Sequence, residues 1–350
     1  MTSTPSARVI LIVGFAALTL GPSFHDLARG FLGRVATAVR EESPSPSSGA
    51  CAAVVGRLTR EESPIMRGLR PFWSAAMLRA FDATSGFVVK GRRDWLFAGW
   101  SLLPLDPERS RRALEEKLAF VDQVRELDRR GGSRTIVIVI PSKWRIHGDC
   151  LARSGVPTNR RQLLPLVLES LRARGVEAPD VDHALLAARL SDPDLPIYHP
   201  ADSHLSRRGC EILVSSVLAP LFGVSESEAG KRIDALPRVR TDDFGNLAAL
   251  LDLDPDAEPG RRYRLQEVSA DAPSGRDAEG SDLVLLGDSH AYYHDRLVAR
   301  LLGPATRLTV DARFATGLDE SRAARLMQDY ASKPPKAVLL FIDEKSFASH

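Results

Sequence analysis

The stretch DLVLLGDS, residues 282–289, indicates the fold class of this chain. Residues 283–286 form an apolar run, as a strand buried on both faces of a sheet requires. A glycine and two polar residues interrupt the run, and a helical pattern follows at residues 291–302. We therefore expect Ser289 at the carboxyl end of a strand and the start of a helix, where open α/β sheets bind ligands.

The same alternation of strands and helices continues on both sides of this stretch. Residues 135–140, TIVIVI, form a second apolar and β-branched run. Further strands are expected at 176–181, 307–310 and 337–342, and helices at 109–129, 160–174, 206–221 and 319–331. Repeated strand–helix units predict an α/β fold with a mostly parallel sheet and helices on both faces.

The chain of 350 residues has the length of about two average domains, but one α/β domain with insertions fits equally well. The Ser/Pro-rich stretch EESPSPSSGA, residues 41–50, is typical of a flexible spacer, which we place at residues 25–70. The pattern of a packed domain then covers residues 71–350. Within it, residues 223–280 are polar and poorly periodic, and we expect an insertion that lies over the sheet edge.

The N-terminal residues 1–24 contain an apolar segment. Residues 9–20, VILIVGFAALTL, carry no charge. This run is short for a membrane-spanning helix, which needs about 17–25 residues, and long enough for the core of a signal peptide. A small-x-small cleavage pattern is missing after Leu20, which favours an uncleaved signal anchor. A cleaved signal peptide and a buried helix of a cytosolic protein remain alternatives, and the arginines that follow the run oppose the positive-inside rule.

The composition excludes several classes of protein. Hydrophobic residues make up 44% and charged residues 26%, so wholesale disorder is excluded. A net charge of +2 provides no global field for nucleic acid, which we do not expect as a partner. The three cysteines, Cys51, Cys150 and Cys210, cannot all pair within the chain. Cys150 and Cys210 either pair with each other or remain free buried thiols.

Ser289 is a candidate nucleophile. Backbone N–H groups at the start of a helix can stabilise an oxyanion, and Gly287 allows a tight turn before the serine. A serine hydroxyl needs a base within hydrogen-bond reach to act as a nucleophile. The alternative is that Ser289 only caps the helix.

A candidate base lies in the stretch YHPADSH, residues 198–204. Asp202 and His204 are separated by one residue, so in an extended loop they project to the same side. The carboxylate of Asp202 could then hold the imidazole in the tautomer that accepts a serine proton. In the alternative interpretation, Asp202 is a helix N-cap and His204 a surface residue.

Four blocks of the sequence resemble the alginate O-acetyltransferase family of periplasmic SGNH-hydrolase-like proteins, which O-acetylate exopolysaccharides. The blocks are GRRDWLF at 91–97, VIPSK at 139–143, YHPADSH at 198–204 and LLGDS at 285–289, with a weaker echo in DFGNLA at 243–248. The resemblance covers about residues 70–350. Three departures from the family pattern are Leu205 in place of a tryptophan, His290 after the serine, and a final strand that ends in Asp-Glu-Lys where Glu-Arg is usual.

The resemblance implies a three-layer SGNH-hydrolase-like fold in which Asp202 and His204 precede the serine, the permuted motif order of this family. It implies Ser289 as the nucleophile, His204 as the general base and Asp202 as the acid that orients it. Gly317 is a candidate for the glycine of the oxyanion hole. Lys143, after a central strand, could bind an anionic substrate or could be solvated above a packed stem.

The resemblance also implies an exported O-acetyltransferase that acts through a serine acyl-enzyme. If water replaces the sugar hydroxyl, the same site is an esterase. The implied partners are a polysaccharide acceptor and a membrane-bound O-acyltransferase that supplies acetyl groups. The implied location is the cell inner membrane, with a single pass and the catalytic domain in the periplasm.

A metal site is an alternative interpretation of the same motifs. His199, Asp202 and His204 lie close in sequence, and His290 and His294 are four residues apart in a predicted helix, a spacing that suits Zn²⁺ or Mn²⁺. A proline stiffens the first cluster and no HExxH element accompanies the second, so we expect no metal and no cofactor. A non-catalytic polysaccharide-binding scaffold is the remaining alternative.

Overall fold

The computed structural model describes residues 75, 78, 87–151, 155–272, 281–314 and 334–348. The chain divides into two compact units, Met1–Ala76 and Met77–His350, and all the elements named below belong to the second. The predicted boundaries after residues 24 and 70, the predicted helix at 319–331 and Gly317 lie outside the described residues. Among the described residues, none of the helices is long and apolar enough to cross a membrane.

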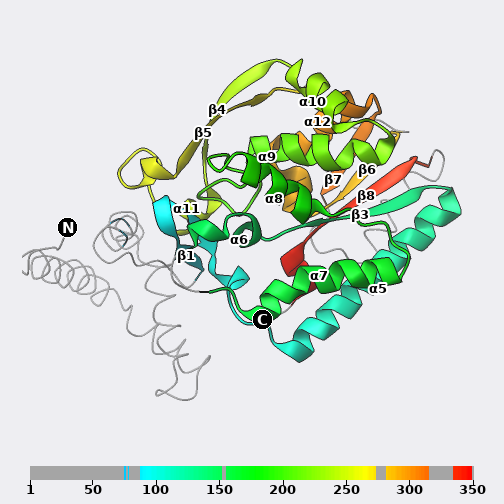
Figure 1. Ribbon diagram of the computed structural model, residues 1–350, viewed down its shortest axis with the longest axis horizontal. Coiled ribbons are helices and arrows are strands. Elements are labelled where there is room, and N and C mark those ends of the chain that lie inside the picture. Colours follow the sequence, from blue (N-terminus) through cyan, green and yellow to red (C-terminus); the bar gives the residue numbers. More distant parts are fainter. Residues whose placement is uncertain are drawn as a thin grey trace, which may run out of the picture. The chain divides into compact units, whose positions relative to one another are not determined.

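A parallel four-stranded sheet forms the centre of the second unit (Figure 1). Its strands are β3 (Arg134–Ile140), β6 (Leu283–Gly287), β7 (Val310–Phe314) and β8 (Ala337–Asp343). Their order across the sheet is β3-β8-β6-β7, so β8 lies between β3 and β6. The predicted parallel sheet is confirmed, and three of its four strands, β3, β6 and β8, are the apolar runs recognised in the sequence.

Helices cover both faces of this sheet. On one face, α5 (Pro107–Gly131) and α7 (Thr158–Ala173) lie side by side (Figure 1). The other face carries the following helices: α8 (Val181–Ser191), α9 (Arg207–Ile212) with its π-helical continuation Leu213–Leu218, α10 (Glu226–Asp234) and α12 (Ser289–Thr306).

The side chains of β3 show how the strands hold the layers together. Ile136, Ile138 and Ile140 belong to the hydrophobic cluster that includes α8, α9 and α12. Val137 and Val139 point to the opposite face and belong to the cluster of α5 and α7. Because successive side chains of a strand alternate between faces, an uninterrupted apolar run is buried on both sides.

Two hairpins complete the described structure. One consists of β1 (Val88–Lys90) and β2 (Leu96–Ala98), and the other of β4 (Arg238–Phe244) and β5 (Arg264–Ala270). Short helices α6 (Lys143–Ile146) and α11 (Asn246–Leu250) follow β3 and β4.

The region 223–280, which we expected as an insertion over the sheet edge, contains regular elements up to residue 272. It contains α10, β4, α11 and β5, and α10 packs against α12 in the helical layer. The buried side chains of Ala229 and Ile233 form the face of α10 that packs there. A short helix with only two buried apolar residues leaves little periodicity to detect.

Two predicted strands also differ. The expected strand at 176–181 is a single bridge between Ile136 and Glu177, because Asp180 caps α8 immediately afterwards. The strand expected at 307–310 begins at Val310, since Arg307 ends α12 in a left-handed conformation.

Candidate active site

The candidate site lies where the parallel strands end. Ile140 of β3 pairs with Asp343 of β8, and Gly287 of β6 pairs with Phe341 of β8. The segments that follow β3, β6 and β8 therefore emerge at one edge of the sheet, as the sequence predicts for Ser289.

The structure brings Ser289, His204 and Asp202 together in one hydrogen-bonded chain. Ser289 Oγ lies 2.7 Å from His204 Nε2, and His204 Nδ1 lies 2.6 Å from Asp202 Oδ1. The Asp202 carboxylate can only accept, so Nδ1–H donates to it and Nε2 is left to accept the serine proton. This is the arrangement that activates a serine hydroxyl.

A narrow loop holds the acid and the base on the same side. Tyr198 and Leu205 form an antiparallel bridge, and the His199 N–H donates to the His204 carbonyl at 3.2 Å. Asp202 Oδ1 also accepts from the backbone N–H of His204 at 2.9 Å. One carboxylate oxygen thus fixes both the backbone and the ring of the histidine, a local turn that aspartate favours.

The second oxygen of Asp202 has two further donors, which the sequence analysis missed. The backbone N–H of Asn246 lies 2.7 Å from Asp202 Oδ2, and the Tyr293 hydroxyl 2.6 Å from it. Burial raises the pKa of Asp202, but the donors from His204, Tyr293 and Asn246 outweigh burial and hold the pKa below its usual range. Asp202 is therefore ionised at neutral pH.

His204 lies between two aromatic neighbours. Its ring stacks on Tyr293 at 4.0 Å between centroids with an interplanar angle of 14°, and the His290 ring lies 4.9 Å away. Burial lowers the pKa of His204, and the hydrogen bond to Asp202 opposes this only in part. The ring is consequently neutral at pH 7 and able to take a proton.

Tyr293 reaches this position through an interruption of α12. Its ψ angle is 155°, and the next three residues, His294, Asp295 and Arg296, are left-handed with φ between 51° and 59°. Left-handed conformations cost a non-glycine residue about 1–2 kcal/mol each. The sequence predicted an uninterrupted helix here, and for that reason Tyr293 was not linked to Asp202.

Gly287 and Asp288 shape the turn that presents the serine. A Cβ at Gly287 would lie 2.5 Å from Phe341 Cβ, and its φ is outside the left-handed region. Close approach to β8, rather than a tight turn, requires this glycine. Asp288 accepts from His290 N at 3.0 Å and from Asp343 N at 2.8 Å, which joins the serine turn to the end of β8.

The segment DFGN, residues 243–246, packs against the loop that carries Asp202 and His204. A Cβ at Gly245 would lie 2.0 Å from the carbonyl oxygen of Ala201, and the Leu247 N–H donates to that oxygen at 3.0 Å. Only glycine fits this approach. The sequence marked the Gly245-Asn246 pair, but it did not reveal that Asn246 donates to Asp202, because Asp202 lies in another segment.

Lys143 differs from both expectations. Its side chain is buried, and Nζ donates to four backbone carbonyls, those of Leu96, His199 and Pro200 at 2.7 Å each and of Asp202 at 3.0 Å. The ammonium is neither solvated nor available to an anionic substrate.

A second histidine–carboxylate pair lies beside the first. His290 Nε2 is 3.4 Å from Asp343 Oδ2, and Lys345 Nζ is 2.8 Å from the same oxygen. Burial raises the pKa of Asp343, but the charge of Lys345 and the His290 contact outweigh it, so the pKa lies below the usual range.

The histidines of the metal hypothesis are engaged elsewhere. His199 Nδ1 accepts from Ala201 N at 3.0 Å, and Nε2–H donates to the Asp243 carbonyl at 2.9 Å. His294 donates to the Leu205 carbonyl at 3.2 Å, whereas His290 faces Asp343. Within the described residues, the sequence clusters therefore do not offer a set of converging free ligands.

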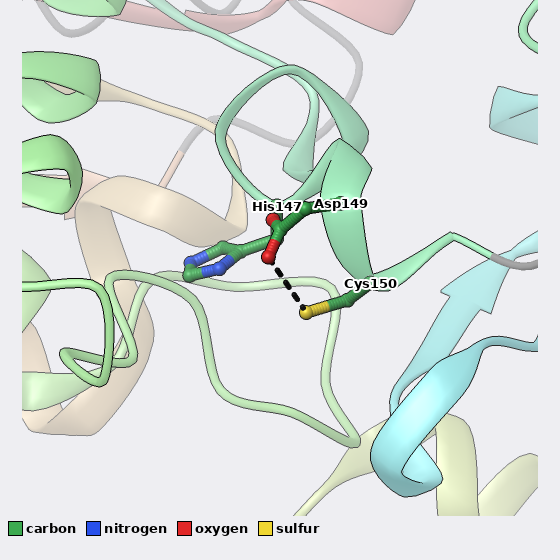
Figure 2. A group of neighbouring side chains, drawn as sticks. All are labelled: His147, Asp149 and Cys150. Carbon is green, nitrogen blue, oxygen red and sulfur yellow. Dashed lines mark hydrogen bonds between the residues drawn. The ribbon is translucent and has the colours of Figure 1, made fainter.

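Another cluster of metal-type ligands lies at residues 147–150 (Figure 2). The candidate atoms of His147, Asp149 and Cys150 lie within 4.8 Å of one another. Arg189 pairs with Asp149 at 3.2 Å. Burial is the largest cause that lowers the pKa of His147, and the charges of Lys143 and Arg189 lower it further. This positive surrounding opposes a bound cation.

Cys150 and Cys210 are both free and buried, so they do not form the disulfide that the sequence left open.

The fold and the site together define an α/β domain of the SGNH-hydrolase-like class, with the serine after the acid–base loop in the chain. More closely, the chain belongs to the family described as "SGNH hydrolase-like domain, acetyltransferase AlgX", whose family model matches residues 88–338.

Individual relatives agree with this assignment. The chain is 29% identical over 299 residues to the "Probable alginate O-acetylase AlgJ" of Pseudomonas aeruginosa, covering 82% of this chain and 73% of the relative. A Pseudomonas syringae pv. tomato protein of the same description is 24% identical over 232 residues, 64% of this chain and 56% of that protein. The solved O-acetyltransferase domain of Pseudomonas putida AlgJ superposes with a TM-score of 0.56 and 19% identity, over 74% of this chain and 91% of that domain, which shows the shared fold.

Proposed function

We propose that this protein is an exported O-acetyltransferase that transfers an acetyl group, through an acyl-enzyme on Ser289, to hydroxyl groups of an exopolysaccharide. The observation that carries the proposal is the chain of hydrogen bonds Ser289–His204–Asp202, with donor–acceptor distances of 2.7 and 2.6 Å. The family and the names of the relatives support an acetyl group as the transferred unit.

In the first half-reaction, Ser289 Oγ attacks the acetyl carbonyl of the donor. Its proton moves to His204 Nε2, and the ionised Asp202 stabilises the imidazolium that forms. The backbone N–H of Ser289, at the start of α12, is the donor we assign to the oxyanion, because the N-terminus of a helix favours negative charge. His204 then gives its proton to the leaving group.

In the second half-reaction, a sugar hydroxyl replaces the leaving group. His204 Nε2 removes its proton while the oxygen attacks the acetyl-Ser289 ester, and Ser289 recovers a proton when it leaves. If water takes the place of the sugar, the product is free acetate. A transferase therefore has to exclude water from the acyl-enzyme.

The partners follow from the same chemistry. An exported transferase is separated from cytosolic acetyl-CoA, so we assign the supply of acetyl groups to a membrane-bound O-acyltransferase. The acceptor is a polysaccharide of the class that the names of the relatives indicate. We place the enzyme at the cell inner membrane, with its catalytic domain in the periplasm.

The test combines an aryl acetate donor with candidate oligosaccharides, followed by mass spectrometry of sugars and protein. Acetylated sugar and an acetyl adduct on Ser289 are expected, and both should vanish in Ser289→Ala. Free acetate without acetylated sugar would replace the transferase with an esterase, and absence of both would overturn the proposal.

A fluorophosphonate probe gives a second readout that needs no acceptor. It should label the wild-type protein but neither Ser289→Ala nor His204→Ala. Ser191→Ala is the matched control, because the Ser191 hydroxyl donates to the Ala188 carbonyl at an exposed site and its loss should leave labelling unchanged.

A further inference from the structure

We propose that Lys143 is a positioning residue, whose ammonium acts as a tethered cation that sets the loop carrying Asp202 and His204. The inference rests on the proposed function, because it assigns the base to that loop.

The surroundings of the Lys143 ammonium are those of a cation site. Four carbonyl oxygens converge on Nζ at 2.7–3.0 Å. The rings of Trp95 and Phe97 lie 4.8 and 5.3 Å from it, within the range of cation–π attraction. The lysine is 7% exposed, so the ammonium is largely shielded from solvent.

The acceptors favour the charged form of the side chain. An ammonium has three N–H donors and no lone pair, so it can face four oxygens if one N–H is shared. Burial lowers the pKa of Lys143, which the charge of Asp202 opposes. A neutral amine, however, would turn its lone pair toward one of the carbonyls. The three N–H donors of the ammonium match the four carbonyls better than the two of a neutral amine.

The ammonium determines the shape of the loop because three of its acceptors belong to it. The carbonyls of His199, Pro200 and Asp202 all point toward Nζ, and parallel alignment of such dipoles is unfavourable without a cation between them. The Asp202 carbonyl is turned to Lys143 while its carboxylate is turned to His204. By fixing the carbonyl of Asp202, Lys143 thus fixes the direction in which the Asp202 side chain points toward His204.

The same atom joins three of the sequence blocks. Lys143 follows β3, its acceptor Leu96 lies in β2, and the remaining acceptors lie in the acid–base loop. The Leu96 N–H also donates to the Pro200 carbonyl at 2.9 Å. The hairpin before the sheet is thereby fastened to the loop across the end of β3.

The decisive variant is Lys143→Met, which keeps the length of the side chain and removes its charge. We expect the acylation rate of Ser289 by an aryl acetate to fall about 10²-fold, because a displacement of about 1 Å between base and nucleophile has this effect. KM should change little, since the ammonium touches no substrate. Lys336→Met is the matched control: this lysine is 66% exposed at the other end of β8 and its loss should leave both constants unchanged.

Chemical rescue separates positioning from simple loss of stability. In Lys143→Ala, methylammonium should occupy the vacated cage and restore the acylation rate with saturation, at a temperature where circular dichroism shows a constant folded fraction. Tetramethylammonium, which cannot donate hydrogen bonds, should not. If Lys143→Met fails to fold, this comparison decides alone.

Two results would overturn the inference. One is a folded Lys143→Met that is acylated as fast as wild type, and the other is equal rescue by both ammonium salts. Both leave the proposed function intact, because wild-type Ser289 is still acetylated. If wild-type Ser289 takes up no acetyl group, the proposed function itself fails.

Discussion

Two histidine–carboxylate pairs lie side by side at the carboxyl edge of the sheet, and only one of them is arranged as a relay. His204 Nδ1 is 2.6 Å from Asp202, whereas His290 Nε2 is 3.4 Å from Asp343. Asp343 is in addition paired with Lys345 at 2.8 Å. The carboxylate of Asp343 thus forms an ion pair with a lysine, whereas that of Asp202 is bound by the His204 ring and two neutral donors.

The comparison teaches that proximity of an acid and a histidine does not define a base. The other ring nitrogen must face a nucleophile, and the carboxylate must be held by neutral hydrogen-bond donors rather than by an ion pair with a lysine or arginine. Asn246 N–H and the Tyr293 hydroxyl are such neutral donors for Asp202. They hold the carboxylate in place without cancelling its charge.

Substitution of the two histidines should produce the largest difference in acylation rate. His204→Gln removes the base, and loss of the histidine from a serine relay costs about 10⁶-fold in rate. His290→Gln should cost far less, because His290 faces Asp343 and lies outside the Ser289–His204–Asp202 chain of hydrogen bonds, although its ring also contacts that of His204. Burst kinetics with an aryl acetate measure both. Similar losses in the two variants would break the comparison.

Substitution of the two carboxylates should produce the second-largest difference in acylation rate. Asp202→Asn should lower the acylation rate about 10⁴-fold, because an amide no longer selects the productive tautomer of His204. Asp343→Asn removes a partner of Lys345 outside the Ser289–His204–Asp202 chain, so its effect on the acylation rate of the folded protein should be far smaller, while the loss of a buried ion pair should lower the stability. The same assay, with circular dichroism to check the fold, measures the pair. A large loss in Asp343→Asn alone would place the base at His290.

Tyr293→Phe sharpens the comparison at the donors of Asp202. The variant keeps the ring stacked on His204 and removes one hydrogen bond to an ionised carboxylate, worth about 1.5–3 kcal/mol. We expect the rate to fall about tenfold or slightly more. The pKa of Asp202 should rise because a donor that lowers it is lost. A rate equal to wild type would remove Tyr293 from the site.

The smallest expected effect concerns pH. Burial lowers the pKa of His204 from its ordinary 6.5, and the base works only when neutral. The midpoint at which acylation declines should therefore lie below pH 6.5. The acylation rate, measured between about pH 4 and 8, gives the midpoint of this decline. A midpoint above 6.5 would contradict the burial of His204.

Much of the framework was predictable from local patterns. β3, β6 and β8 match the predicted strands to within one residue at each end, because strands buried on both faces are apolar throughout. β7 and the segment at 176–181 were wrong in position or extent. Their limits depend on helix ends at Arg307 and Asp180, which apolar runs do not mark.

The site was predictable only where side chains carry the signal. Asp202, His204 and Ser289 are recognisable residue types at recognisable places. Lys143 was misjudged because its partners are backbone carbonyls, 47 to 59 residues away, that no residue type reveals. Tyr293 was missed because three left-handed residues interrupt a helix that periodicity describes as continuous.

The strand order has a consequence for timing. β8 follows β3, β6 and β7 in the chain, yet it is inserted between β3 and β6. Its Asp343 N–H completes the turn before Ser289, and its Phe341 packs against Gly287. A chain that is synthesised or threaded across a membrane from its N-terminus delivers β8 after the base and the serine. The turn before Ser289 therefore acquires these two contacts only when the last strand arrives.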